Sequence, residues 1–249
     1  LSSIIATTGL AIFSIWYFAK KKLLVKNIQQ KYIRMEFKFG ISQIFFQLNI
    51  FVLASTDKYM IGHMLHDVPG LGIYFVANQF AFIINVIVGA FFFSYQPLLY
   101  TYLADLNITN KYKLLKFKYI LESFFFVCTL LLCLAPPFFY KHFIKDTYHT
   151  GIAYVAWNAF AFFFWGLYSL FLGYLYYYRK NQVVIIFSIL SSALCILLNY
   201  FFITKFRIIG AAYADLLTYF ILFIALFITV QQVIKIKMPW FQFKKIFYS

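Results

Sequence analysis

Long apolar blocks, separated by short polar segments, run along the whole of this chain. Each block has about 20 residues, the helical length that crosses ~30 Å of hydrocarbon. The pattern predicts membrane-spanning helices at 1–19, 39–61, 71–95, 119–139, 152–178, 183–203 and 208–231. We therefore expect an all-α fold, a polytopic transmembrane helix bundle of about seven spans.

Composition supports the membrane class. Of the 249 residues, 64% are hydrophobic and 12% are charged, whereas soluble domains carry roughly 25% charged residues. The 35 Phe and 21 Tyr residues suit lipid-facing and headgroup-level positions. Cys128, Cys133 and Cys195 all fall inside apolar spans, without the spacing of a metal or haem site. We expect no metal and no cofactor.

The positive charge is distributed unevenly between the loops. The net charge is +15, and 17 of the 22 basic residues lie in the first, third and fifth loops and the C-terminal tail. This alternation is the positive-inside pattern, and it predicts residue 1 outside and the C-terminus in the cytoplasm. The expected electrostatic partner is anionic membrane lipid and not nucleic acid.

The pattern also predicts three regions. Residues 1–38 form a transmembrane helix with a basic cytoplasmic linker, 39–231 a six-helix bundle, and 232–249 a basic cytoplasmic tail. Apolar residues in 20–38 recur at near-helical spacing, which leaves open an amphipathic helix on the inner membrane surface. The odd number of spans and a start within a helix suggest the C-terminal part of a longer transporter.

Two neighbouring spans, 39–61 and 71–95, are punctuated by polar side chains, and these include Gln43, Gln47, Asn49, Asn78, Gln79 and Asn85. Polar groups in a spanning helix must face other helices or a watery cavity. We expect these two helices to line a cavity. The last two spans form a hairpin around Lys205-Phe206-Arg207, and Gly210 and Ala214 are spaced for close helix approach.

Several runs, taken in order, resemble one family of transporters. They are Asp57-Lys58-Tyr59-Met60-Ile61-Gly62, Gly72-Ile73-Tyr74-Phe75-Val76-Ala77-Asn78-Gln79, Phe93-Ser94-Tyr95-Gln96-Pro97-Leu98-Leu99-Tyr100, Leu197-Leu198-Asn199-Tyr200-Phe201-Phe202-Ile203 and Ile208-Ile209-Gly210-Ala211-Ala212-Tyr213-Ala214. The chain is similar to the C-terminal half of the polysaccharide biosynthesis and O-antigen repeat-unit flippases. These belong to the multidrug/oligosaccharidyl-lipid/polysaccharide exporter superfamily.

The resemblance implies transport without bond chemistry in a bacterial inner membrane. Its substrate would be an undecaprenyl-pyrophosphate-linked oligosaccharide, flipped by alternating access for surface polysaccharide synthesis. Polysaccharide assembly proteins would be further partners. Other readings stay open: a drug/cation antiporter, a peptidoglycan lipid-precursor flippase, a membrane-embedded polysaccharide polymerase or ligase, or a non-transporting scaffold. The outer loops of about ten residues argue against a polymerase or ligase, and no catalytic residue is expected.

The resemblance also suggests residues that contact substrate. Asp57 and Lys58 match the family's acid-base pair at the outer end of its seventh helix, and they are otherwise a snorkelling interface pair. Asn78, Gln79 and Gln96 lie where the family carries polar residues. Their amides could bind sugar hydroxyls or bond across helices. Asn199, in the last hairpin, is a further cavity candidate.

Asp215 lies about two turns into the last span, and the resemblance gives it no role. Because intramembrane carboxylates are expensive and often mark ion or proton pathways, Asp215 is our candidate for proton or sodium coupling. The competing interpretations are an ion pair with Arg207 or hydrogen bonds to Asn199.

Other ionisable residues have simpler expected roles. Lys118 and Glu122 are four residues apart, which predicts an ordinary ion pair on a helix surface. His63, His66, His142 and His149 fall in outer loops. They could sense pH, but no closed ligand set for a metal is evident.

Overall fold

The computed structural model describes residues 2–21, 30–105 and 107–234. The regular elements of the described residues are all helices: α1 (Ser2–Lys20), α2 (Gln30–Leu65), α3 (Val68–Ala81), α4 (Ile83–Ala104), α5 (Ile108–Leu134), α6 (Pro136–Phe143), a 3₁₀ helix η1 (Asp146–Gly151), α7 (Ile152–Tyr177), α8 (Asn181–Phe206) and α9 (Ile208–Ile234). The all-α prediction is confirmed.

Six helical segments of the described chain are long and apolar enough to cross a membrane: Gln30–Leu65, Val68–Ala104, Ile108–Leu134, Asp146–Tyr177, Asn181–Phe206 and Ile208–Gln232. They make the chain a multi-pass membrane protein. The prediction of about seven spans is therefore approximate. The predicted span 1–19 coincides with α1, which is helical over 19 residues but is not one of these six.

The chain divides into two compact units, Leu1–Ile41 and Ser42–Ser249. In the first unit, α1 ends in an exposed aromatic and basic cluster. The Lys20 ammonium lies 4.9 Å from the centroid of the Trp16 ring, a cation–π contact at the end of an apolar helix. Of the predicted linker, residues 22–29 lie outside the described residues, and residues from Gln30 onward continue into α2.

The predicted span 71–95 corresponds to two helices in series. α3 and α4 are separated only by Phe82, whose N–H donates to the Asn78 carbonyl at 2.8 Å and whose carbonyl accepts from the Val86 N–H at 3.1 Å. The helical hydrogen bonds therefore continue across Phe82. As a result, 68–104 forms a single apolar segment of 37 residues.

The predicted span 119–139 was misplaced. α5 begins 11 residues earlier, because Asn107 caps its N-terminus by accepting from the Asn110 N–H at 2.7 Å, a favoured role for Asn. Lys111 and its basic neighbours therefore lie on a helix and not in a loop, since lysine is a good helix former. At its other end α5 stops at Leu134, just before Pro136 begins α6.

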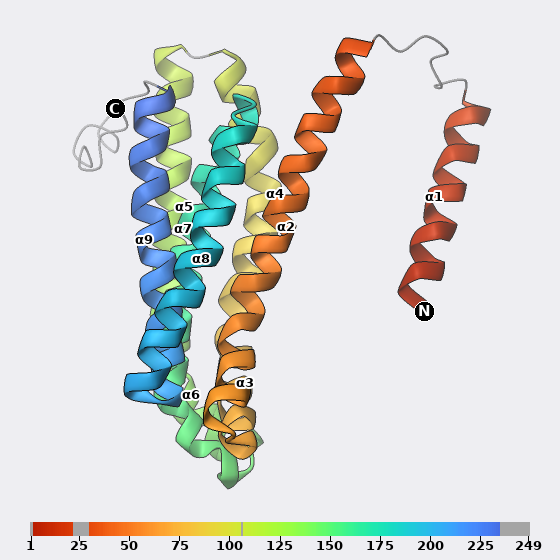
Figure 1. The fold of residues 1–249 in the computed structure, drawn as a ribbon. Coiled ribbons are helices and arrows are strands. Elements are labelled where there is room, and N and C mark those ends of the chain that lie inside the picture. Colours follow the sequence, from red (N-terminus) through yellow and green to blue (C-terminus); the bar gives the residue numbers. More distant parts are fainter. Residues whose placement is uncertain (1, 22–29, 106, 235–249) are drawn as a thin grey trace. The chain divides into compact units, whose positions relative to one another are not determined.

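In the second unit, α7 is the central helix (Figure 1), and it packs against α3, α4, α5 and α9. Two glycines let α4 approach it closely. A Cβ added to Gly166 would lie 2.6 Å from Val88 Cγ2, and one added to Gly173 would lie 2.9 Å from Leu99 Cδ2. Small residues at helix contacts are a general feature of packing in membranes.

α8 packs mainly against α9. The predicted hairpin is confirmed: α8 ends at Phe206 and α9 begins at Ile208, with Arg207 between them in a left-handed conformation (φ 59°). The turns α2–α3 and α8–α9 lie at the same pole of this unit as α6, opposite the α4–α5 connection (Figure 1). The candidate site lies toward the pole that contains α6.

Candidate functional site

One face of α2 is fixed against the rest of the bundle. Its buried residues recur about every four positions, which places them on one helical face: Asn49, Leu53, Asp57 and Ile61. The Asn49 side-chain oxygen accepts hydrogen bonds from the hydroxyls of Ser191 at 2.6 Å and Ser192 at 2.9 Å, both on α8. These bonds hold α2 to α8 and bring Asp57 into the core.

Asp57 and Lys58 form an ion pair within α2. The Lys58 ammonium donates to both carboxylate oxygens, at 2.9 Å and 3.1 Å, and to the Ala54 carbonyl at 3.0 Å. The Asp57 side chain is only 1% exposed, whereas that of Lys58 is 24% exposed. The carboxylate is therefore shielded from solvent, while its lysine partner keeps limited access.

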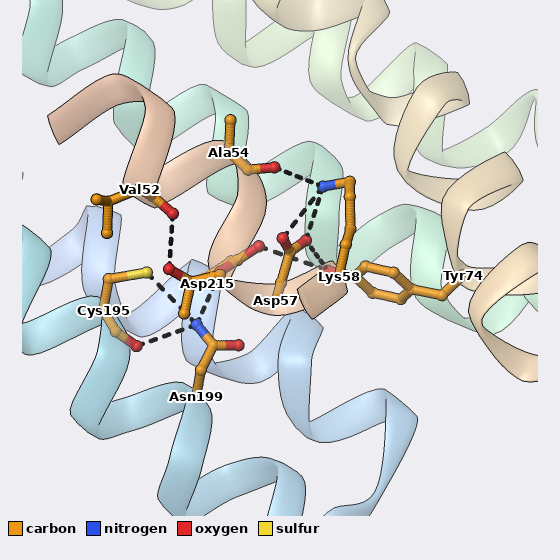
Figure 2. Close-up of polar contacts among 9 residues, drawn as sticks. Val52, Ala54, Asp57, Lys58, Tyr74, Cys195, Asn199 and Asp215 are labelled. Carbon is orange, nitrogen blue, oxygen red and sulfur yellow. Dashed lines mark hydrogen bonds and ion pairs between the residues drawn. The ribbon is translucent and has the colours of Figure 1, made fainter. Parts of the chain in front are cut away.

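Tyr74 connects this ion pair to Asp215 (Figure 2). Its hydroxyl on α3 lies 2.9 Å from Asp57 Oδ2 and 3.4 Å from Asp215 Oδ2. The other Asp215 oxygen accepts from the Asn199 amide nitrogen at 3.3 Å. Tyr74 and Asn199 are fully buried, and Asp215 is 5% exposed. Four helices thus contribute to one buried polar cluster: Asp57 and Lys58 from α2, Tyr74 from α3, Asn199 from α8 and Asp215 from α9.

Next to this cluster is a cavity of about 320 Å³. Its wall combines two carboxylates and a lysine with amide and aromatic side chains. The polar lining residues are Asp57, Lys58, Asn78, Gln79, Asn85 and Asp215. The aromatic rings of Phe82, Phe162, Trp165 and Tyr219 complete much of the wall. As expected, the helices at 39–61 and 71–95 line a cavity, together with α7 and α9.

The structure brings together most of the residues singled out from the sequence, but not all. Asp57, Lys58, Asn78, Gln79 and Asp215 line the cavity, and Asn199 reaches it indirectly through Asp215. Gln96 lies apart, because it follows Asn78 by 18 residues, about 27 Å of helix. It instead donates a hydrogen bond to the Tyr100 hydroxyl at 2.8 Å.

The structure also distinguishes the two competing interpretations of Asp215. The hydrogen bond from Asn199 is present. Among the described residues, Asp215 forms no ion pair with Arg207, which is exposed in the α8–α9 turn. Both partners of the Asp215 carboxyl are therefore neutral side chains.

A second buried charge lies on α5. The predicted pair of Lys118 and Glu122 is confirmed at 3.1 Å, but its predicted place on the surface is wrong, because the Lys118 side chain is only 1% exposed. Helices α5 and α7 enclose the ammonium, which lies 4.6 Å from the Tyr119 ring centroid and 5.2 Å from that of Phe171. Tertiary packing over the aliphatic stem, which sequence spacing does not reveal, explains the difference.

The histidines take local structural roles at the pole near α6. The His63 and His66 rings lie 6.2 Å apart, and Asp67 caps α3 by accepting from the Gly70 N–H at 2.8 Å. His149 contacts the carbonyl oxygens of Tyr140 and Ile144. Within the described ranges, no three or more His, Cys, Asp or Glu residues are grouped so that they could hold a metal ion.

Two residues of this region were not singled out from the sequence. Tyr74 was noted only within a run of the resemblance, although it links the two carboxyls. Asn158 on α7 is 1% exposed, and neither polar atom of its amide has a partner among the described residues. It precedes the lining residue Phe162 by one turn. A polar residue within the long apolar run 152–178 was the signal that could have drawn attention to Asn158.

Comparison of the chain with protein-family models, with curated proteins and with solved structures finds no match. A function is therefore inferred from the cavity, its lining and the buried cluster beside it.

Proposed function

We propose that this chain is part of a transporter that flips undecaprenyl-pyrophosphate-linked oligosaccharides across the bacterial inner membrane by alternating access. The observation that carries the proposal is the cavity of about 320 Å³ inside a bundle of membrane-spanning helices, lined by amides, charged groups and aromatic rings. Ligand sites commonly form between the helices of bundles and combine apolar walls with a few polar groups. In this proposal no covalent bond of the substrate is made or broken.

The lining has the chemistry that a sugar needs. The amides of Asn78 and Gln79 offer both donors and acceptors to hydroxyl groups, and they add no net charge. Gln79 is exposed and accessible to a ligand, whereas Asn78 is buried. The Trp165 ring, which stacks on the Phe46 ring with centroids 6.4 Å apart, offers a rigid apolar wall for the faces of a sugar ring.

Lys58 supplies the cationic group that an anionic diphosphate requires. All three of its ammonium protons already have acceptors, two on Asp57 and one on the Ala54 carbonyl. Diphosphate binding would therefore replace part of this ion pair. The volume is at the lower end of the range for small-molecule sites, roughly 300–1,000 Å³, so the cavity holds one portion of the substrate.

The proposed orientation places residue 1 outside and the C-terminus in the cytoplasm. Basic side chains support it: Lys111, Lys113, Arg179 and Lys180 lie near the α4–α5 and α7–α8 connections, at the pole opposite α6 (Figure 1). A cytoplasmic excess of Lys and Arg favours this arrangement. It places the Asp57 cluster toward the outer side and leaves the basic pole to contact anionic lipid.

The test is complementation of a bacterial strain that lacks its own O-unit flippase. The strain expresses the complete product of the gene. The lipopolysaccharide ladder on a gel is the measurement. We expect the ladder to be restored by the wild type, to be strongly reduced by Gln79→Ala, and to be unaffected by Gln47→Ala. Gln47 is the matched control, because it is an exposed amide of α2 outside the cavity lining.

Two outcomes would contradict the proposal. One is that the wild-type protein does not restore the ladder, although it is present in the membrane and the strain makes a compatible repeat unit. The other is a ladder that Gln79→Ala and Gln47→Ala leave equally intact, since the cavity would then have no part in transport.

A second candidate function is cation-driven export of small organic cations. The observation that favours it is the pair of buried carboxyls, Asp57 and Asp215, on the cavity wall. Efflux of a fluorescent organic cation from cells, measured with and without an ion gradient, separates the two functions. Gradient-dependent efflux together with an absent ladder would favour the exporter.

A further inference from the structure

We infer that Asp215 carries a proton in this conformation, and that Tyr74 links this proton to the Asp57–Lys58 pair. The number of protons available for these hydrogen bonds supports this inference. The Tyr74 oxygen is 2.9 Å from Asp57 Oδ2 and 3.4 Å from Asp215 Oδ2. A phenol has one proton to donate, and an ionised carboxylate has none, so only one of these two contacts can use the Tyr74 proton.

The Tyr74 proton belongs with Asp57, at the shorter of the two distances. The contact between Tyr74 and Asp215 then needs a proton from Asp215. With Asp215 protonated at Oδ2, the bonds run in one direction: Asp215 donates to Tyr74, Tyr74 donates to Asp57, and Lys58 also donates to Asp57. The second oxygen of Asp215 still accepts from Asn199 at 3.3 Å. Every oxygen of both carboxyls then has a partner.

The charge of the cluster leads to the same conclusion. Asp57 and Lys58 compensate each other, so an ionised Asp215 would leave one net negative charge at a site that is 5% exposed. Uncompensated charge in a membrane-spanning region is unfavourable. The other titratable groups facing Asp215 are Tyr219 on its own helix and Cys195 on α8, and neither provides a positive charge. One added proton makes the cluster neutral.

The same chain of bonds gives the proton a route between helices. Asp215 releases its proton to the Tyr74 oxygen while Tyr74 passes its own proton to Asp57 Oδ2. One O–H bond forms and one breaks at Tyr74, and no electrons are transferred. Asp57 is then neutral, and Lys58 loses its ionised partner on α2.

This transfer connects the proton to the substrate, a step that rests on the proposed function. Without an ionised Asp57, the Lys58 ammonium is available to an anionic diphosphate in the cavity. Proton transfer to Asp57 and diphosphate binding at Lys58 therefore favour each other, and the coupling is reciprocal. Tyr74 is the positioning residue, because it joins carboxyls of α2 and α9 that have no direct bond to each other.

The test measures proton occupancy and does not depend on transport. The purified protein, reconstituted in lipid nanodiscs and labelled with carbon-13 on its aspartate carboxyls, is examined by infrared spectroscopy at neutral pH. We expect a C=O stretching band of a protonated aspartic acid in the wild type. Asp215→Asn should remove the band, and Tyr74→Phe should shift its frequency because the hydrogen-bond partner is lost.

Asp146→Asn is the control, since Asp146 is fully exposed in η1, and it should leave the band unchanged. Gel filtration and a thermal unfolding scan show that each variant is folded. A wild type without the band, or a band that persists in Asp215→Asn, overturns the inference. If sodium abolishes the band and choline at the same ionic strength does not, the site binds sodium, and the inference is also overturned. Loss of flipping with the band intact contradicts the proposed function alone.

Discussion

Gly210→Ala is the substitution that most directly tests how the α8–α9 hairpin positions the site. Gly210 is buried near the start of α9, three residues after the turn at Arg207. A Cβ added there would collide with the Phe202 carbonyl oxygen, and it would lie 2.5 Å from the Phe202 carbonyl carbon and 2.9 Å from the Ile203 nitrogen. These are backbone atoms of α8, so no side-chain rotation can relieve the contact.

The magnitude follows from two opposing effects. Replacing glycine by alanine inside a helix is favourable by about 1 kcal/mol when nothing obstructs the methyl group. Overpacking a filled core typically costs about 1–3 kcal/mol, and sometimes more. Because the obstruction here is backbone, we expect a value at the upper end and a net loss of about 2 kcal/mol of stability. α9 must move away from α8, and the bond from Asn199 to Asp215, at 3.3 Å, should lengthen.

The assay is thermal unfolding of the purified protein in one detergent, followed by intrinsic fluorescence. Gly89→Ala is the matched control, since Gly89 lies inside α4 and an added Cβ there would have no atom within 4 Å. We expect the midpoint to fall for Gly210→Ala and to stay level or rise for Gly89→Ala. Equal or higher stability for Gly210→Ala would refute the close approach of α8 and α9 on which the geometry of Asp215 depends.

Three further substitutions test the ion pair of α5, the contact between α2 and α8, and the N-terminal cap of α3. Lys118→Met should lower the unfolding midpoint, by about 3 kcal/mol in free energy, because it leaves Glu122 without its partner; adding Glu122→Gln should recover most of this loss, and no recovery would mean that the ion pair is not the cause. Asn49→Ala should cost about 1–3 kcal/mol, since the Ser192 hydroxyl loses this acceptor and the Ser191 hydroxyl keeps only the Ser188 carbonyl at 3.0 Å, whereas the same unfolding scan of Ser192→Ala should show a smaller change. Asp67→Ala should cost about 1 kcal/mol through loss of the α3 cap, and an unchanged midpoint would show that the cap is unimportant.

The sequence predicted those features that depend on local chemistry. The spans 152–178, 183–203 and 208–231 agree closely with α7, α8 and α9. The ends of a membrane helix are set by the length of its own apolar run and by the turn residues that flank it, and both can be read from the local sequence. The end of α5 at Leu134 differs from the predicted end at 139, although its cause is local, since Pro136 cannot continue the hydrogen bonding of the preceding helix. The early start of α5 is not evident from the sequence, because its first turns carry several lysines, which are typical of a loop between spans but are also compatible with a helix.

The candidate site was only partly predictable, for a physical reason. Asp57 and Asp215 were conspicuous as acids at or within apolar spans, but Tyr74 is one of 21 tyrosines and no spacing distinguishes it. Its bond to Asp57 spans 17 residues and its bond to Asp215 spans 141 residues. Such contacts arise only when helices pack. Burial of Lys118 under the Phe171 ring is tertiary in the same sense.

The two buried clusters differ in how their charges are compensated, and this difference bears on transport. Lys118 has its carboxylate on the same helix, and Lys58 has Asp57 on the same helix, so both ion pairs survive when helices move relative to one another. Asp215 is different, because every group that stabilises its carboxyl lies on another helix: Asn199 on α8 and Tyr74 on α3. A rearrangement of α9 against α3 would break the bond to Tyr74 while leaving the ion pairs intact. We therefore expect the proton occupancy of the Asp215 carboxyl to change with conformation, as the proposed alternating-access transport requires of a coupling group.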